Sequence, residues 1–176
     1  MNPWHDIERG KKIPKEFNSV IEIPKDSMNK YEIDKRSGLL RLDRVLYSPV
    51  HYPGNYGFIP RSFWDDEDPL DVLVLGTTAI HPRTVVKTRP IGILKMIDNL
   101  SEDDKIIAVP LRDPRMSDVK DIKDFPEHRL KEIKHFFRIY KELQDEIVKV
   151  VEFKGRREAE KAIKRSVKLY DEKFIP

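Results

Sequence analysis

One stretch constrains this chain more than any other: residues 64–75 read Trp-Asp-Asp-Glu-Asp-Pro-Leu-Asp-Val-Leu-Val-Leu. Five carboxylates fall within seven positions, and four consecutive apolar residues follow them; the acids are Asp65, Asp66, Glu67, Asp68 and Asp71. Carboxylates crowded at the start of a buried strand raise one another's pKa, so such a cluster needs cations. Mg²⁺ prefers oxygen ligands and is usually held by one or two carboxylates together with substrate phosphates. The stretch therefore predicts a magnesium site.

The same acids have a simpler interpretation, because runs of charge are often solvated turns. An EF-hand is a poor fit, since no Gly provides its sharp turn and Thr77 stands where that loop needs Glu. Pro69 interrupts regular strand geometry, and a turn there would bring Asp66, Asp68 and Asp71 to one side. From this stretch alone, both the metal site and the solvated turn stay open.

A second acidic group has the same form as the first. It consists of Asp98, Glu102, Asp103 and Asp104, and it follows the apolar segment 91–96. By itself this group is typical of an exposed loop. If the two groups meet, they suit a site with several metal ions, which can hold both the attacking and the leaving oxygen of a phosphoryl displacement.

Composition limits the class of protein. The chain has 176 residues, and we expect one domain over residues 1–176. The net charge is only +3, from 34 basic and 31 acidic residues, which argues against the basic footprint of a nucleic-acid-binding protein. Disulfide and thiolate chemistry are excluded because there is no cysteine. We see neither a signal peptide nor an apolar run long enough to span a membrane, so we expect a cytoplasmic protein without membrane contact.

Periodicity predicts many short strands followed by two helices. We expect strands at 19–23, 29–34, 39–42, 72–75, 85–87, 91–96 and 106–109, and a loop or irregular strand at 49–60. Residues 1–17 read as an irregular arm or a short helix. The period changes to 3.6 residues after residue 125, and the two helices centre on 130–143 and 159–170. This order predicts an α+β fold: a β-barrel or curled sheet with helices packed on its outside.

Basic and tyrosine side chains could bind phosphate oxygens, since Arg offers a planar fork and Lys a point charge. The candidates are Lys30, Arg44, Tyr52, Tyr56, Tyr140 and Lys141. Each has an ordinary alternative: Lys30 could be a surface charge, and Tyr140 could be a core aromatic on the apolar seam of its helix.

Taken together, the motifs resemble a known family. Asp66-Glu67-Asp68-Pro69-Leu70-Asp71-Val72 is similar to the signature of soluble family I inorganic pyrophosphatases, of prokaryotic or archaeal type. Further segments resemble that family in the family's order: residues 21–24, 30–35, 43–44, 52–57, 89–92, 95–98, 103–105, 135–137 and 140–141. The resemblance covers about residues 18 to 145, and several motifs in one order are far more specific than any single motif.

The resemblance implies an OB-like five-stranded barrel with two helices in the C-terminal half, assembled as a homo-oligomer, commonly a hexamer. It implies hydrolysis of inorganic diphosphate to two orthophosphates, with several Mg²⁺ ions. The implied metal ligands are Asp66, Asp71 and Asp103, with Asp98 sharing an ion, and the implied general base is Asp68, which deprotonates a water held between two metals. The residues implied to hold substrate are Lys30, Arg44, Tyr56, Lys105, Tyr140 and Lys141, with Glu22, Glu32 and Tyr52 in support.

One position departs from the family pattern. Glu67 stands where the family generally has Gly or another small residue. If the backbone there needs a positive φ, Glu is strained and adds a carboxylate close to the metals. We expect its side chain to point to solvent.

Two other functions compete with this interpretation. A Mg²⁺-dependent phosphoesterase acting on nucleotides would need a place for the base, and no clear Gly-rich nucleotide loop is present. An OB-type module that binds single-stranded nucleic acid would use aromatic residues along a basic groove. Here the strand ends are acidic and would repel phosphate without a metal.

Overall fold

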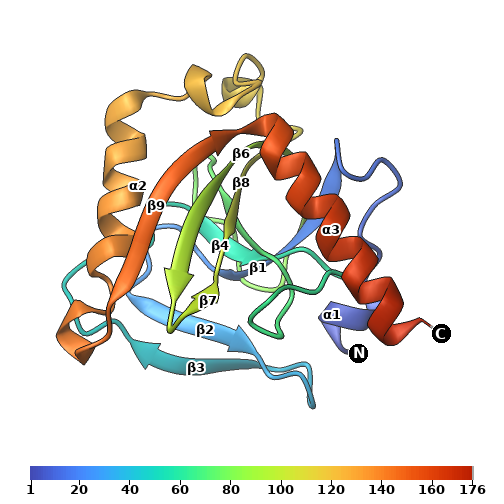
Figure 1. Ribbon diagram of the computed structural model, residues 1–176, viewed down its shortest axis with the longest axis horizontal. Coiled ribbons are helices and arrows are strands. Elements are labelled where there is room, and N and C mark those ends of the chain that lie inside the picture. The colour runs from blue at the N-terminus through green and yellow to red at the C-terminus, as the bar shows by residue number, and fades with distance from the viewer. Residues whose placement is uncertain (176) are drawn as a thin grey trace.

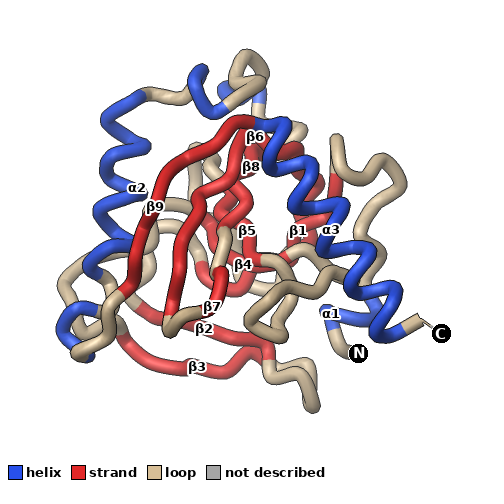
Figure 2. The backbone as a smooth tube through the Cα atoms, viewed as in Figure 1, coloured by secondary structure: helices blue, strands red, loops and turns tan. Residues whose placement is uncertain are grey.

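The computed structural model describes residues 1–175. Its centre is a mixed sheet whose strands ring around an axis, with few helices outside it (Figure 1; Figure 2). The strands that pair in this ring are β1 (Phe17–Ile23), β4 (Asn55–Phe58), β5 (Asp71–Val74), β8 (Lys105–Pro110) and β6 (Val85–Asp98), and β6 pairs again with β1. Within residues 1–175, β5 and β8 are the only parallel pair of this sheet. Asp71, the first residue of β5, therefore lies beside Lys105, which directly follows Asp103 and Asp104 at the start of β8.

A two-stranded hairpin lies at one end of the ring, at the bottom of Figure 1. It consists of β2 (Asn29–Ile33) and β3 (Leu40–Val45), and it pairs Lys30 with Arg44. Strands are expected at 29–34 and 39–42, and β2 and β3 occur there, although β3 continues three residues further, to Val45. The side chains of Lys30 and Glu32, two residues apart, share one face of β2, as the period of a strand requires.

Helices pack on the outside of the ring, as predicted (Figure 1). α2 (Glu127–Ile139) buries Ile133, Phe136 and Phe137 against one hydrophobic cluster of the sheet. α3 (Arg156–Phe174) buries Ala159 and Ile163 against another. A short helix, α1 (Pro3–Asp6), is capped by the Asn2 side chain. No helix within residues 1–175 is long and apolar enough to cross a membrane.

One predicted pair of strands is wrong in its boundaries. Residues 85–87 and 91–96 form one continuous 14-residue strand, β6, in place of two. Pro90 lacks a backbone donor and suggests a break. In the structure the pairing with β8 shifts register between Pro90 and Gly92, and this irregularity accommodates the proline without ending the strand.

Three further strands were not predicted as such. β4 lies inside the segment expected to be a loop or irregular strand, and β7 (Ser101–Glu102) is a short pairing beside the end of β6. β9 (Val148–Gly155) pairs with β6 from Gly92 to Asp98. Exposed charged residues alternate unevenly with apolar ones in β9, so its strand signal is weak beside the helical patterns on either side.

Candidate active site

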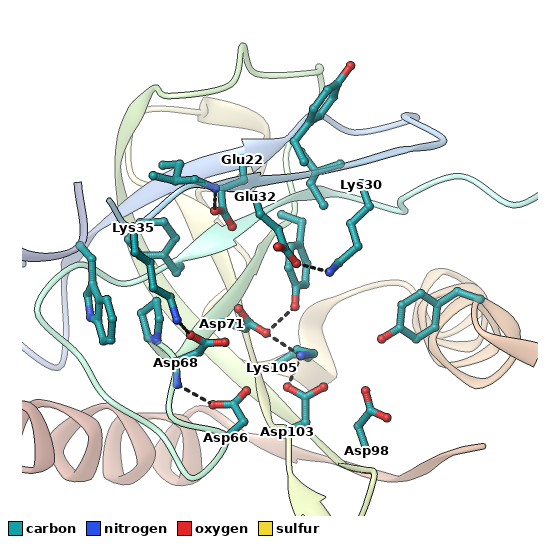
Figure 3. A pocket seen from close by; sticks show the side chains of 18 of the residues that line it. Glu22, Lys30, Glu32, Lys35, Asp66, Asp68, Asp71, Asp98, Asp103 and Lys105 are labelled. Carbon is teal, nitrogen blue, oxygen red and sulfur yellow. Dashed lines mark hydrogen bonds and ion pairs between the residues drawn. The ribbon is translucent and has the colours of Figure 1, made fainter. Parts of the chain in front are cut away.

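A cavity of about 320 Å³ opens between the hairpin and the start of β5 and β8 (Figure 3). Most of the predicted site residues line it: Glu22, Lys30, Glu32, Tyr56, Asp66, Asp68, Asp71, Asp98, Asp103, Lys105, Tyr140 and Lys141. They come from segments more than 100 residues apart in the chain. The two acidic groups of the sequence therefore meet in one place.

The floor of the cavity is set by the parallel pairing of β5 with β8, which puts Asp71 beside Lys105. The ammonium of Lys105 donates to Asp71 Oδ2 at 2.6 Å and also contacts Asp103, so it lies between two carboxylates (Figure 3). Burial disfavours its charge, but Asp103 and Asp71 outweigh burial and raise the pKa of Lys105 well above its usual range. Lys105 is therefore a buried, permanently charged cation in the cavity.

Tyr56 extends from β4 to the same carboxylate. Its hydroxyl donates to Asp71 Oδ2 at 2.5 Å. Burial, together with the negative charge of Asp71, raises the pKa of Tyr56 well above its ordinary value, so the hydroxyl keeps its proton. It can therefore act as a donor to an anionic ligand.

The loop before β5 turns Asp66 and Asp68 into the cavity. The Trp64 N–H donates to the Asp68 carbonyl at 2.8 Å, which closes the loop, and the Asp68 N–H donates to Asp66 Oδ1 at 3.2 Å. Pro69 then leads into the buried Leu70 and the first residue of β5. All three aspartates line one cavity, as a bend at Pro69 predicts.

Glu67 lies at the tip of this loop with a φ of 67° and is exposed to solvent. Its N–H donates to the Trp64 carbonyl at 3.1 Å. The side chain is not among those that line the cavity. The left-handed backbone explains why a small residue suits this position, and the extra carboxylate is exposed to solvent and outside the cavity lining.

Glu67→Gly should therefore leave hydrolytic activity within a few-fold. Removing Cβ relieves a left-handed strain of about 1–2 kcal/mol. The greater freedom of Gly in the unfolded chain offsets about 0.5–1 kcal/mol of that. Steady-state kinetics test the activity, and thermal unfolding tests the net change in stability. A large loss of activity would mean that Glu67 takes part in metal binding.

Asp98 ends β6 on the far side of the cavity and pairs with a lysine that follows α2. Lys141 Nζ donates to Asp98 Oδ2 at 2.5 Å and to Glu146 Oε2 at 3.1 Å. Tyr140, at the end of α2, is buried and still lines the cavity, so it serves both as a core aromatic and as a possible donor. Tyr140 and Lys141, which are adjacent in the sequence, thus both line the cavity.

Two predicted residues lie just outside the cavity lining. The Arg44 guanidinium donates to Asp43 Oδ2 at 3.0 Å, and Lys30 reaches the same oxygen at 3.3 Å. Tyr52 is in the core, with its ring centroid 4.9 Å from that of Phe136. Arg44 is therefore connected to the cavity through Asp43 and Lys30. Tyr52 supports the cavity by packing in the core behind it.

The structure adds residues that the site prediction omitted. The ammonium of Lys35 contacts Asp68 and lies 5.2 Å from the centroid of the Trp4 ring. Asn2 donates to the Lys35 carbonyl at 2.8 Å, and both Asn2 and Trp4 line the cavity. Lys35 belongs to a motif of the family resemblance, so a signal for it exists. No pattern in the sequence connects the N-terminal arm with residues some 30 positions later.

Acidic side chains outnumber basic ones in the cavity lining. Burial, followed by the charges of Asp71 and Asp103, raises the pKa of Asp66 to about 7. Burial likewise raises the pKa of Glu22 to about 8, against the effect of its hydrogen bond from Ile33. Burial also raises the pKa of Asp103. Asp66 and Glu22 thus hold protons near neutral pH, in a site that would gain from bound cations.

The donors fit divalent cations in chemical type. Among residues 1–175, Asp98 Oδ1 is buried without a hydrogen-bond partner. Asp66, Asp71 and Asp103 each use one oxygen for the protein contacts described above. Free carboxylate oxygens around one cavity are the ligands that Mg²⁺ prefers. Within the described chain, no three acidic or histidine side chains lie close enough together to hold one ion. Lys105 lies between two of the candidate ligands, Asp71 and Asp103.

The sequence has clear relatives. The family model for inorganic pyrophosphatase matches residues 19–171. The soluble inorganic pyrophosphatase of Oryza sativa subsp. indica is 50% identical over 169 residues, which are 96% of this chain and 79% of the rice protein. The soluble inorganic pyrophosphatase 1 of Arabidopsis thaliana is 47% identical over 174 residues, 99% of this chain and 82% of that protein.

Solved structures show the same arrangement of the chain. The crystal structure of the inorganic pyrophosphatase from Thermus thermophilus superposes with a TM-score of 0.94 at 40% identity, covering 97% of this chain and 99% of that one. An inorganic pyrophosphatase from Helicobacter pylori gives a TM-score of 0.91 at 44% identity, covering 95% and 99%. These matches confirm the predicted fold class, an OB-like ring of strands with few helices.

Proposed function

This chain belongs to the inorganic pyrophosphatase family and hydrolyses inorganic diphosphate to two orthophosphates, and we propose that the described cavity is where it does so. Enzymes of this family depend on metal ions, and we propose Mg²⁺ as the ion, held by Asp66, Asp71 and Asp103 with Asp98 sharing. One observation carries this proposal: carboxylates from two distant acidic groups line one cavity together with buried lysine and tyrosine donors.

The metal ions, the general base and the lysines have different roles in the proposed hydrolysis. Bound Mg²⁺ ions would supply positive charge and lower the pKa of a coordinated water. Asp68, half-exposed at the cavity mouth, accepts a proton from the attacking water. Lys30, Lys105 and Lys141 neutralise diphosphate oxygens and hold them in place, as electrostatic stabilisation of phosphoryl transfer requires.

The remaining donors complete substrate binding. Tyr56 and Tyr140 donate hydrogen bonds to diphosphate oxygens, and Arg44 reaches the substrate from the hairpin beside Asp43. Glu22 and Glu32 act at the edge of the site through waters or ion pairs, and Tyr52 packs behind Tyr56 at 5.4 Å between ring centroids. No covalent nucleophile is needed, because the water attacks phosphorus directly while the bridging P–O bond breaks and the second orthophosphate leaves.

The test of this function is orthophosphate release from diphosphate and from ATP, with Mg²⁺ and with a chelator. We expect rapid Mg²⁺-dependent hydrolysis of diphosphate and little hydrolysis of ATP. Chelation should abolish release. Equal rates on both substrates would contradict the specificity and favour the phosphoesterase alternative.

Mg²⁺ affinity should depend on pH because protons compete for the ligand carboxylates. With its pKa raised to about 7, Asp66 keeps its proton below that pH, and the metal must displace it. The apparent Kd for Mg²⁺ should therefore rise by up to about tenfold per pH unit below pH 7 and level off above pH 8. Isothermal titration calorimetry between pH 6 and pH 8 measures this.

Asp66→Asn is the matched variant for that titration. It should bind Mg²⁺ more weakly and show a shallower dependence on pH, because its amide does not titrate. An affinity for Mg²⁺ that does not change between pH 6 and pH 8 in the unmodified protein would contradict the assignment of Asp66 as a ligand.

We further propose that the chain forms one domain and assembles as a homo-oligomer, a hexamer by family resemblance, in the cytoplasm. The composition supports the location, since the chain has no cysteine. Analytical ultracentrifugation with and without Mg²⁺ measures the assembly.

A further inference from the structure

The two segments that carry the proposed metal ligands are each fixed from outside the cavity by an adjacent carboxylate. Asp66 lines the cavity, whereas Asp65 pairs with Arg165 of α3. Asp103 lines the cavity, whereas Asp104 is buried and contacts Lys95. In both segments, one acid faces the proposed metals and its neighbour is held by a cation.

The Arg165 contact is geometrically specific. Its guanidinium makes two parallel hydrogen bonds to Asp65, NH1 to Oδ2 at 2.9 Å and NH2 to Oδ1 at 2.6 Å. The same guanidinium stacks 4.4 Å from the centroid of the Trp64 ring. A bidentate, stacked arginine fixes both the position and the orientation of its partner, which a lysine at the same place would not do.

The loop that receives this contact is otherwise short and solvent-exposed at its tip. Its internal hydrogen bonds join Trp64 to Glu67 and to Asp68. A second contact from α3, between the Phe63 N–H and the Ser166 carbonyl at 3.0 Å, holds the start of the loop. The C-terminal helix therefore holds the loop at Phe63 and at Asp65, directly before Asp66.

Arg165 and Lys95 also line one common pocket. Both line a second, smaller pocket of about 220 Å³ together with Trp64, Glu102, Lys154, Glu158, Lys161 and Ala162. The cations of the two ion pairs thus line one outer pocket, which does not include the proposed ligands Asp66 and Asp103.

We propose that Arg165 is a positioning residue for the metal site, acting through Asp65 and Trp64 to orient Asp66, and that Lys95 does the same for Asp103 through Asp104. This inference rests on the proposed role of Asp66 and Asp103 as ligands. Outer contacts that orient a ligand typically change metal affinity by about 10–100-fold when removed. Since Arg165 acts one residue further from the metal, the expected change is at the lower end of that range.

The test is Mg²⁺ binding to the full-length protein by isothermal titration calorimetry, repeated with Mn²⁺. Arg165→Met should raise the Kd for Mg²⁺ about 10-fold. Arg165→Lys should fall between the two proteins, because it keeps the charge and loses the bidentate fork. At saturating Mg²⁺ the kcat of Arg165→Met should return to within about twofold of the unmodified value, since the ligands themselves remain.

Lys161→Met is the matched control. Lys161 lies on the same helix and lines the same outer pocket, but it pairs with Glu158 at 2.8 Å within α3. It should leave the Kd for Mg²⁺ unchanged. Both variants should lower the unfolding temperature of the metal-free protein by no more than about 4 °C, because each removes a partly exposed ion pair. A merely structural role for Arg165 would move that temperature and leave the Kd alone.

A double-mutant cycle shows whether Asp65 transmits the effect. Asp65→Asn combined with Arg165→Met should weaken Mg²⁺ binding no more than the stronger single change, because both remove the same contact. Additive losses would overturn transmission through this pair. An unchanged Kd in Arg165→Met would overturn the inference as a whole.

Asp66→Asn separates this inference from the proposed function. If Asp66→Asn binds Mg²⁺ as tightly as the unmodified protein, the proposed ligand set itself is wrong. If Asp66→Asn weakens binding and Arg165→Met does not, the ligand set stands and only the positioning role fails.

Discussion

Replacing Asp68 with Asn is expected to lower kcat by about 10²- to 10⁴-fold, the usual contribution of a positioned general base. Its carboxylate lines the cavity and is half-exposed, so it can reach a water beside the substrate. The loop should survive the change, because the hydrogen bonds that close it use the backbone N–H and carbonyl of Asp68 and not its side chain. The loss should therefore appear in kcat with the fold intact.

Glu67→Gln is the matched control for that experiment. It removes one negative charge at the adjacent, exposed position outside the cavity lining. Its kcat should stay within a few-fold of the unmodified protein. Near-normal turnover in Asp68→Asn, measured as orthophosphate release at saturating Mg²⁺, would remove Asp68 as the base.

Replacing Lys105 with Met should produce the largest loss of stability in the site. The Lys105 side chain is 3% exposed and is shared by Asp71 and Asp103. Removing one partner of a buried ion pair leaves uncompensated charge and costs about 3–5 kcal/mol. In chelator, the free energy of unfolding should fall by about that amount, as chemical denaturation measures.

Mg²⁺ should restore much of that loss, because a cation bound only by the folded state stabilises it in proportion to its saturation. The difference in unfolding free energy between Mg²⁺ and chelator should thus be wider in Lys105→Met than in the unmodified protein. Lys35→Met is the control: this lysine also lines the cavity but is more than half-exposed, and it should cost less than about 1 kcal/mol. Equal stability of Lys105→Met and the unmodified protein in chelator would contradict a stabilising role for the buried ion pairs of Lys105.

The centre of the candidate site could be predicted from the sequence because its residues lie close together in the chain. Asp66, Asp68 and Asp71 fall within six positions, and Pro69 signals the bend that turns them to one side. The strands on which they depend alternate clearly or run as short apolar segments. Local patterns of this kind are readable without a structure.

What the sequence could not supply is the effect of long-range packing. Pro90 argues locally for a break in β6, yet β8 pairs with β6 on both sides of Pro90, and β1 and β9 pair with the residues before and after it, so one continuous strand forms. β9 has little pattern of its own and becomes a strand because the edge of β6 is available to it. Tertiary pairing overrides local preference in both places.

The same limit applies to the outer parts of the site. Trp4 lies beside Lys35 only after the N-terminal arm docks, with its indole N–H donating to the Ser62 carbonyl at 2.8 Å. Arg165 meets Asp65 across 100 residues of chain. Neither contact has a spacing or motif that predicts it. The run of carboxylates at 65–71, in contrast, predicts a bound cation from the sequence alone, because like charges close together need one.

The most direct test of the central claim, that this acidic cavity holds the catalytic cations, is a crystal structure of the protein with Mn²⁺ in place of Mg²⁺. The anomalous difference map should show peaks about 2.0–2.3 Å from carboxylate oxygens of Asp66, Asp71 and Asp103, a typical distance for hard divalent ions on oxygen ligands. The ammonium of Lys105 should have moved away from at least one of its two carboxylates. Peaks confined to other parts of the chain, with Lys105 still bridging Asp71 and Asp103, would contradict the claim.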